Sequence, residues 1–489
     1  MLARVQSFIL TGIDAAACEV EVDVAPEDTA KDIMVGLPDA AVKESAERVR
    51  SAIQNSGYRH PRGRTVVNLA PADVRKEGPV YDLPIAVGML IADGAVRPPG
   101  AGARARLHSD DHEVDRALGL DRDGLDHRRY LFAGELALDG RVRPIRGAIA
   151  MAALARERGL DGVVLPADNA GEAAVVKGVE AVGVRTLAEV VGILNGAITA
   201  RPHPAIDIAD LIQQAKAELD FAEVRGQEAV KRAVTIAAAG RHNLLMIGPP
   251  GSGKTMIAKA LPGVMPPLSP DEAIEVTRIY SAAGGTARNG AGGDGLVTVR
   301  PVRSPHHTAS MPAVIGGGSG PSPGEVSLAH RGVLFLDELP EFPRPVLETL
   351  RQPLEDQCVT ISRAAAKVRF PASFMLVAAM NPTPKGTMPG AGDLGARRDM
   401  DRYLSRLSGP LVDRIDIHVE APAVPWKQLS SPGAEGRGTS SAEIREKVLG
   451  AVERQRERQG ATPNALLKGK ALDAVAELPE DARTMLGQA

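Results

Sequence analysis

The strongest constraint on the fold is a glycine-rich turn that follows a short apolar run. Residues 244–247 read LLMI, and residues 248–255 read GPPGSGKT before a helix-like stretch begins. A strand, a turn of this spacing and a helix are the context in which backbone N–H groups surround phosphates. The pattern therefore predicts a P-loop in an α/β domain. The alternative is a chance glycine-rich turn, for which strand, turn and helix signals would have to coincide.

The residues of this turn have distinct expected roles in holding a phosphate chain. The predicted nucleotide-binding residues are Gly248, Pro249, Pro250, Gly251, Ser252, Gly253, Lys254 and Thr255. The glycines let the backbone curl around the phosphates, and the Lys254 ammonium places a positive charge on the β and γ phosphates. The Thr255 hydroxyl is expected to bind Mg²⁺. ATP and Mg²⁺ are therefore the predicted cofactors.

A second apolar run ends in two acids. Residues 333–336 read VLFL and precede Asp337 and Glu338. At the end of a buried strand, Asp337 is expected to hold Mg²⁺, and Glu338 is expected to polarise the attacking water. A pair of helix N-cap residues is the alternative. A third strand, predicted over residues 374–379, precedes Asn381, a candidate sensor for the γ phosphate or the water.

The length of 489 residues exceeds what one hydrophobic core usually serves, so two or three domains are expected. Alternating strand-like and helix-like runs predict an α/β module first, then a proline-containing linker, the nucleotide module and a helical segment. Their predicted bounds are 1–195, 196–215, 216–425 and 426–489. Residues 100–129 are dense in Arg, Asp and His and poor in apolar residues, which predicts a solvated loop.

The last segment begins with a helix signal. Ser440 and Glu443 have capping-box spacing, and Ile444, Val448 and Val452 recur on one helical face. A small helical lid is predicted. The chain then ends in helix-like sequence without a Gly or Pro stop, and we expect the lid to be truncated.

Composition limits the partners. A net charge of −3 gives no global attraction to polyanions, and an aromatic fraction of 3% disfavours a base-stacking platform. Cys18 and Cys358 match no metal spacing and indicate reduced thiols, so no zinc is expected. The N-terminus has no signal-peptide pattern, and the composition is not that of a membrane protein. A cytoplasmic protein is the expectation.

Any contact with a nucleic acid would therefore have to come from local basic residues. Residues 358–370 read as two short strands around a small-residue turn and carry Arg363, Lys367 and Arg369. These side chains are candidates for phosphate contact, and a solvated hairpin face is the alternative. The adjacent His306 and His307 have no neighbouring ligands for a metal site, so a pore-facing or structural loop is expected there.

Several longer motifs resemble the ComM/YifB family of magnesium chelatase-like AAA+ ATPases. The motifs are GPPGSGKT, VLFLDELPEF, SPHHTASMPAVIGGGSGPSPGEVSLAH and LSGPLVDRIDIHVEAP, together with MVGLPDAAVKESAERVRSAI and VNLAPADVRKEG in the N-terminal module. The resemblance covers most of the chain. It implies an α/β protein with a Lon-protease-like (S5-like) N-terminal domain, an AAA+ P-loop parallel-sheet core and a small helical C-terminal lid.

The resemblance also implies how the protein acts. It implies a homo-hexameric ring that hydrolyses ATP and moves branched or single-stranded DNA, as a helicase or branch-migration motor in recombination or natural transformation. Arg414 would then reach the γ phosphate of a neighbouring subunit as an arginine finger. Arg406 is the fallback for that role. A surface ion pair of Arg414 with Asp413 or Asp416 is the alternative interpretation.

Three departures from the family pattern limit these expectations. The positions that match the nucleophile and base of the Lon-like peptidases hold Val80 and Ile149, so proteolysis is not expected. The family's cysteine cluster after Asn381 is absent, which again gives no zinc site. The second sensor arginine would lie beyond Ala489 and cannot be assigned.

Two other functions use the same nucleotide pocket. A magnesium chelatase-type ATPase subunit would insert Mg²⁺ into a porphyrin with separate partners, and the fused N-terminal module disfavours it. An ATP-switched scaffold would bind nucleotide without sustained turnover. The Asp337–Glu338 pair favours hydrolysis over that alternative.

Overall fold

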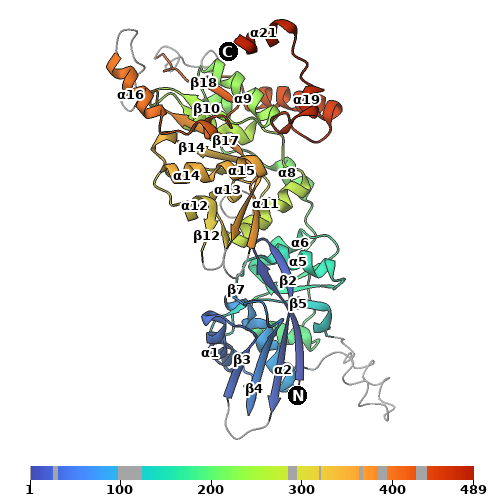
Figure 1. Ribbon diagram of the computed structural model, residues 1–489. Coiled ribbons are helices and arrows are strands. Elements are labelled where there is room, and N and C mark those ends of the chain that lie inside the picture. The colour runs from blue at the N-terminus through green and yellow to red at the C-terminus, as the bar shows by residue number, and fades with distance from the viewer. Residues whose placement is uncertain are drawn as a thin grey trace. The chain divides into compact units, whose positions relative to one another are not determined.

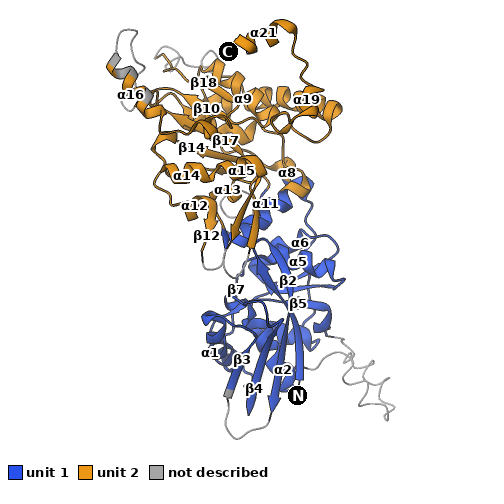
Figure 2. Cartoon of the chain, viewed as in Figure 1, with its two compact units in different colours: residues 1–211, 273–297, 320–322 blue, residues 212–272, 298–319, 323–489 orange. Residues whose placement is uncertain are grey.

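A computed structural model describes residues 2–25, 31–96, 124–284, 295–318, 321–362, 367–383, 394–425 and 438–488. Arg363, residues 100–123 of the predicted solvated loop and residues 426–437 of the predicted helical segment lie outside the described residues. The chain forms two compact units, shown in blue and orange in Figure 2. Unit 1 comprises residues 1–211, 273–297 and 320–322, and unit 2 comprises residues 212–272, 298–319 and 323–489.

Unit 1 contains a four-stranded sheet in the order β1-β2-β4-β3. Its strands are β1 (Leu2–Thr11), β2 (Asp14–Ala25), β4 (Arg64–Ala70) and β3 (Lys31–Val35). β1, β2 and β4 pair antiparallel, and β3 joins β4 in parallel. The helix α2 (Asp82–Ala92) is buried along its whole length, which explains why its sequence is apolar on all sides.

A second sheet of unit 1 is parallel, in the order β5-β8-β9. Its strands are β5 (Tyr130–Phe132), β8 (Gly162–Pro166) and β9 (Glu180–Val184), and β6 (Glu135–Leu136) forms a small hairpin with β7 (Val142–Arg143). The other helices of the unit are α1 (Ala40–Asn55), α5 (Ala148–Glu157), α6 (Ala167–Ala174) and α7 (Leu187–Leu194), with 3₁₀ turns η1 (Pro79–Tyr81) and η2 (His127–Arg129).

The structure differs from the predicted organisation of this unit in two places. Residues 124–129 do not belong to a solvated loop, because Leu125 N donates to Ile193 O and the His127 side chain is buried. Residues 273–297, which the sequence placed in the nucleotide module, cluster with unit 1. They include most of α11 (Pro270–Ala283), where Ser281 Oγ accepts a hydrogen bond from Gly147 N at 2.9 Å.

Unit 2 is built on a five-stranded parallel sheet in the order β11-β14-β17-β10-β18. The strands are β11 (Val302–Arg303), β14 (Val333–Leu336), β17 (Met375–Met380), β10 (Leu244–Ile247) and β18 (Ile417–Glu420). Every residue of β14 and β17 is buried, as expected for central strands covered on both faces. Figure 1 shows β10, β17 and β14 side by side. The mixed α/β class with a parallel sheet is therefore confirmed.

The helices of unit 2 follow the strands. They are α9 (Glu228–Gly240), α10 (Lys254–Ala260), α12 (Met311–Ile315), α13 (Glu325–Leu328), α14 (Arg344–Thr349), α15 (Arg351–Asp356), α16 (Leu394–Leu404), α17 (Gly409–Val412), α19 (Ser441–Gln459), α20 (Lys470–Asp473) and α21 (Glu480–Gln488). The 3₁₀ turns are η3 (Phe221–Glu223), η4 (Leu261–Gly263), η6 (Leu339–Glu341) and η8 (Asn464–Leu466). The helix α8 (Ile208–Gln214) contains the division between the units.

Two features of unit 2 match their predictions closely. The helix α19 begins at a capping box formed by Ser440 and Glu443, and its Ile444 and Val448 are buried in the core of the unit. The predicted hairpin consists of β15 (Cys358–Ser362) and β16 (Lys367–Pro371), paired antiparallel. A second hairpin joins β12 (Gly316–Gly317) and β13 (Ser322–Pro323).

Candidate nucleotide site

The candidate site lies at one edge of the unit 2 sheet. β10, β14 and β17 are parallel neighbours, so their carboxyl ends meet at the same edge. The residues that follow these ends are Gly248, Asp337 and Asn381. The sheet topology therefore brings together three segments that are far apart in the sequence.

The P-loop backbone needs glycine at two of its positions for different reasons. Gly253 has φ +90°, a left-handed conformation that other residues rarely adopt. A Cβ on Gly248 would lie 2.0 Å from Ala421 O at the end of β18. The start of the loop is therefore closely packed against the neighbouring strand end, whereas a Cβ on Gly251 or Gly253 would meet nothing within 4 Å.

A residue that the sequence reasoning missed fixes this loop. The Gln227 side chain is buried, and its Nε2 donates to Ser252 O at 3.0 Å and to Pro422 O at 2.6 Å. It joins the P-loop to the segment after β18. The sequence gives a weak signal for this role, because a polar residue before a helix at Glu228 is most simply read as a helix start.

The Lys254 ammonium lies at the centre of the site. It donates to Gly248 O at 2.7 Å and to Pro249 O at 2.9 Å, and Asn381 Oδ1 lies 3.4 Å away. Burial lowers the pKa of this ammonium, and the negative charges of Asp337 and Glu338 oppose the shift. The sequence-predicted lysine, acid pair and asparagine are thus within reach of one another.

The Thr255 hydroxyl donates to Asp337 Oδ2 at 2.9 Å. A hydroxyl and a carboxylate at this separation are the hard oxygen donors that Mg²⁺ uses in P-loop sites, where phosphates and water complete its shell. These two residues therefore fit the predicted ion and would be the ones to hold it. Within the described residues, no group of three or more His, Cys, Asp or Glu side chains forms a metal cluster.

Glu338 occupies an uncommon backbone conformation. Its φ of 52° and ψ of 48° are left-handed, which non-glycine residues adopt mainly under local constraint. Its N–H donates to Asp337 Oδ1 at 2.9 Å, and its side chain is 51% exposed. η6 starts here without a side-chain capping bond, so the structure gives no support to the capping interpretation. His307 Nδ1 lies 3.4 Å from Glu338 Oε2, a contact that the sequence reasoning did not anticipate.

Arg414 is paired within its own chain. Its Nη2 and Nε donate to Glu355 Oε1 at 2.6 and 3.1 Å, so its partner is neither Asp413 nor Asp416. The Asn243 side chain donates to Arg414 O at 2.7 Å and fixes the backbone there. Both members of the ion pair are 41% exposed, and exposed pairs contribute little stability. Breaking the ion pair between Arg414 and Glu355 therefore costs little free energy.

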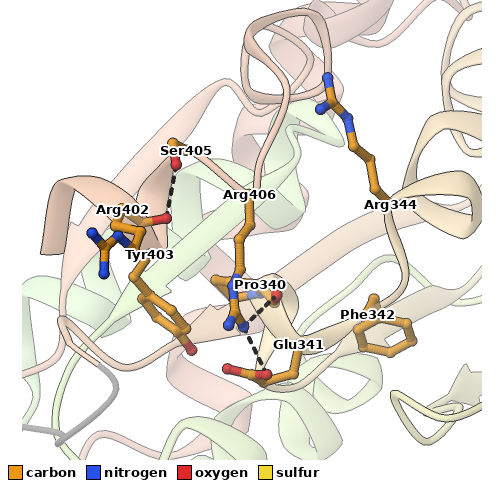
Figure 3. A pocket seen from close by; sticks show the side chains of 8 residues that line it. All are labelled: Pro340, Glu341, Phe342, Arg344, Arg402, Tyr403, Ser405 and Arg406. Atoms are coloured by element: carbon orange, nitrogen blue, oxygen red, sulfur yellow. Dashed lines mark hydrogen bonds and ion pairs between the residues drawn. The ribbon is translucent and has the colours of Figure 1, made fainter. Parts of the chain in front are cut away.

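The fallback residue Arg406 lines a hollow in the surface of unit 2 (Figure 3). Arg406 Nη1 donates to Glu341 Oε2 at 2.8 Å, and its guanidinium carbon lies 5.6 Å from the centre of the Tyr403 ring. Burial, with the charges of Glu341 and Glu338, raises the pKa of the Tyr403 phenol to about 12. Arg344 and Arg402 also line this hollow, which gives it a positive character.

Two of the candidate DNA-binding residues lie on β16. Lys367 and Arg369 are exposed, whereas Val368 and Phe370 between and after them are buried. The alternation of a strand places both cations on the same outer face of the hairpin. The third candidate, Arg363, belongs to the part of the chain that is not described.

The positions that the Lon-like resemblance assigns to a peptidase nucleophile and base are apolar and packed. Val80 lies in η1 against the core of unit 1, and Ile149 in α5 is fully buried. Cys18 and Cys358 are both buried and free. Among the helices of the described residues, none is long and apolar enough to cross a membrane.

The strand, P-loop and helix, together with an acidic strand end beside them, define the P-loop nucleoside triphosphatase class. Family models match most of the chain. The model for magnesium chelatase, subunit ChlI, matches residues 220–429, a model for subunit ChlI of Mg-chelatase matches 20–101 and 118–169, and a model for the ChlI C-terminal region matches 438–489.

Curated relatives cover nearly the same span. Competence protein ComM of Haemophilus influenzae is 42% identical over 481 residues, which are 96% of this chain and 86% of the relative. The uncharacterised YifB of Salmonella typhimurium is 41% identical over 98% of this chain and 87% of its own, and YifB of Escherichia coli is 42% identical over 94% and 83%. The chain belongs to the ComM/YifB family of magnesium chelatase-like ATPases, which confirms the resemblance seen in the motifs. Membership implies ATPase activity and the use of a nucleotide and Mg²⁺.

Proposed function

We propose that this chain is an ATP-hydrolysing ring motor that moves branched or single-stranded DNA in the cytoplasm, as a helicase or branch-migration enzyme in recombination or natural transformation. The observation that carries the proposal is the convergence of Lys254, Thr255, Asp337 and Asn381 at one sheet edge, with Glu338 beside them. The 42% identity to a competence protein supports DNA as the substrate.

We propose the following roles for the residues of the site. The P-loop and Lys254 bind the phosphates, and Thr255 and Asp337 hold Mg²⁺, which supplies charge neutralisation when bound. Glu338 polarises the attacking water, and Asn381, near Lys254, orients the reacting groups. Arg414 leaves Glu355 to reach the nucleotide of a neighbouring subunit in a homo-hexamer.

The proposed DNA contact is the outer face of the β15–β16 hairpin. Lys367 and Arg369 are both exposed there, and two cations on one strand face suit the phosphates of a DNA backbone. For unit 1 we propose a Lon-like fold without peptidase activity, because Val80 and Ile149 provide neither a nucleophile nor a base. For α19 and the helices after it we propose the role of a lid.

ATP turnover measured with and without forked DNA tests the proposal. The expected result is turnover that DNA stimulates and that Lys254→Ala abolishes, because the phosphates lose their principal charge partner. Turnover of the wild type that is indifferent to forked DNA at low and moderate salt would count against a DNA motor.

A chelatase subunit is the second candidate, since the matching family models are those of magnesium chelatase subunit ChlI. Its test is Mg²⁺ insertion into a porphyrin by extracts that supply the remaining chelatase subunits, with this chain added or withheld. Porphyrin metallation that depends on this chain and on Lys254 would favour the chelatase over the DNA motor.

A further inference from the structure

His307 lies beside the acid that the proposed hydrolysis uses. Its Nδ1 is 3.4 Å from Glu338 Oε2, and its side chain is 31% exposed. The ring is held from two sides, because it stacks on His306 at a centroid distance of 4.1 Å and meets the edge of Phe342 at 6.4 Å and 81°. The imidazole therefore has a defined place next to the Glu338 carboxylate.

His307 lies four residues after the end of β11, and Glu338 lies two residues after the end of β14. β11 pairs with β14 in parallel, with Val302 opposite Val333 and Arg303 opposite Leu334. Arg303 is in turn fixed by two hydrogen bonds to the Glu325 carboxylate, at 2.6 and 2.7 Å. His307 thus reaches Glu338 along a segment that is anchored where it leaves the sheet.

The Glu338 carboxylate needs a partner of this kind. Its backbone is left-handed and its side chain is half exposed, so packing alone does not fix its orientation. Its N–H is bonded to Asp337 Oδ1, which fixes the backbone and leaves the carboxylate free to rotate. In the described part of the chain, His307 is the side chain in ion-pair contact with it.

We propose that His307 is a positioning residue that holds the Glu338 carboxylate in the orientation from which it polarises water. The proposal rests on the proposed function, because it needs Glu338 to act in hydrolysis. The side chains that His307 contacts are His306, Phe342 and Glu338, none of which is assigned to phosphate or metal binding. Loss of His307 should therefore lower the rate of turnover and leave nucleotide binding unchanged.

Two substitutions distinguish the contribution of the His307 Nδ1 atom from that of the aromatic ring. His307→Phe keeps an aromatic ring against Phe342 and His306 but removes the nitrogen that faces Glu338. His307→Asn places an amide nitrogen near the position of Nδ1 without the ring. We expect kcat for ATP to fall about tenfold or more in His307→Phe, as misplacement of a catalytic group does, and to recover largely in His307→Asn. The Kd of a non-hydrolysable ATP analogue should stay within about twofold of wild type in both, because a residue outside the binding contacts adds nothing to ground-state affinity.

The contact between His307 and Glu338 can also be tested by NMR, without ATP turnover. In nucleotide-free protein with ¹⁵N-labelled histidine, the resonance that His307→Asn removes is assigned to His307. Glu338→Gln should shift that resonance and leave the one removed by His306→Asn nearly unchanged, since His306 Nδ1 faces Thr308 Oγ1 at 2.8 Å instead. An unmoved His307 resonance would show that the contact does not exist in solution.

Two controls distinguish failure of this inference from failure of the proposed function. Glu338→Gln should lose ~10²- to 10⁴-fold in turnover while it still binds the analogue. If Glu338→Gln turns over ATP like wild type, the assignment of Glu338 itself is wrong. If Glu338→Gln is inactive while His307→Phe keeps the kcat of wild type, the role of His307 is refuted and that of Glu338 stands. His203→Ala is the matched control and should keep the activity of wild type, because the His203 ring nitrogen contacts Pro204 O at 2.9 Å in unit 1.

Discussion

The Thr255 hydroxyl donates a hydrogen bond to Asp337 Oδ2 at 2.9 Å, which joins the start of α10 to the end of β14. One residue comes from the phosphate-binding turn and the other from the acidic strand end. Because the Thr255 hydroxyl and the Asp337 carboxylate are hydrogen-bonded to each other, the glycine-rich turn and the acidic strand end form one site. With Thr255 and Asp337 as its protein ligands, a bound Mg²⁺ would take the rest of its shell from phosphates and water.

The first prediction concerns this pair. Thr255→Ala and Asp337→Asn should each raise the Mg²⁺ concentration for half-maximal ATP turnover by ~10- to 100-fold, because a ligand of the ion is lost. A Mg²⁺ titration at fixed ATP measures this. Thr349→Ala is a matched control, since the Thr349 hydroxyl donates to Val346 O within α14. An unaltered Mg²⁺ dependence in both site variants would contradict the assignment.

The second prediction concerns Arg414 and a neighbouring subunit. If Arg414 acts across an interface, Arg414→Ala should lower turnover by ~10³-fold or more and keep nucleotide binding. Mixing inactive Arg414→Ala with inactive Lys254→Ala should restore part of the turnover. In a mixed ring, the intact P-loop of an Arg414→Ala subunit can lie next to the intact Arg414 of a Lys254→Ala subunit.

The same mixing experiment with Arg406→Ala decides between the two arginines. Arg406 lies beside Glu341 in the hollow of Figure 3, and Arg414 lies beside Glu355. Restoration with Arg406→Ala and not with Arg414→Ala would move the role to Arg406. No restoration with either variant would argue against a shared site.

The third prediction concerns the hairpin. Replacing Lys367 and Arg369 together with alanine should weaken DNA binding and lower the slope of log affinity against log salt by about 2, one for each lost phosphate contact. Turnover without DNA should not change. Arg454 and Arg456, exposed on α19, provide a matched double-alanine control. An unchanged salt slope would mean that the hairpin face is merely solvated.

The fourth prediction concerns acid stability of unit 2. Arg300 is buried and its Nη2 donates to Glu272 Oε2 at 3.0 Å. Burial alone would raise the pKa of the Glu272 carboxyl, but Arg300, the Ser269 N–H, Arg331 and Arg241 outweigh it and hold the pKa below its usual range. A carboxyl with a lowered folded pKa stabilises the protein above its unfolded pKa of about 4.3 and loses that effect as pH falls through the folded value.

Glu272→Gln should therefore lower the free energy of unfolding at pH 7 by about 1.5–3 kcal/mol, the usual contribution of a hydrogen bond to a charged group. The difference in free energy of unfolding between wild type and Glu272→Gln should become smaller as pH falls below about 4. Urea unfolding at several pH values measures both. Glu453→Gln, at an exposed position on α19, should behave like wild type. If the difference in free energy of unfolding did not change with pH, the charge of the Glu272 carboxylate would not be the cause of the lost stability.

The central strands of unit 2 were predictable because burial on both faces requires a continuous apolar run. The sequence runs LLMI and VLFL give β10 and β14 with their observed bounds. The start of α19 was equally predictable, since a capping box needs only Ser440 and Glu443 at the right spacing. These elements could be predicted because a short stretch of sequence determines each of them.

Other contacts depend on chain segments that only the tertiary fold brings together. Gln227 reaches Ser252 and Pro422, and Arg414 finds Glu355 rather than its acidic sequence neighbours. His307 contacts Glu338 beyond the ends of β11 and β14, where no local sequence pattern pairs the two residues. The membership of residues 273–297 in unit 1 likewise follows from packing, since those residues interrupt the nucleotide module in sequence.

Three-strand branch migration by the wild type, Lys254→Ala and Glu338→Gln tests the central claim most directly. The account predicts ATP-dependent movement of the branch point by the wild type and none by either variant, although Glu338→Gln still binds ATP and DNA. Movement by Glu338→Gln at the wild-type rate, or no movement by a wild type that hydrolyses ATP on the same DNA, would contradict it.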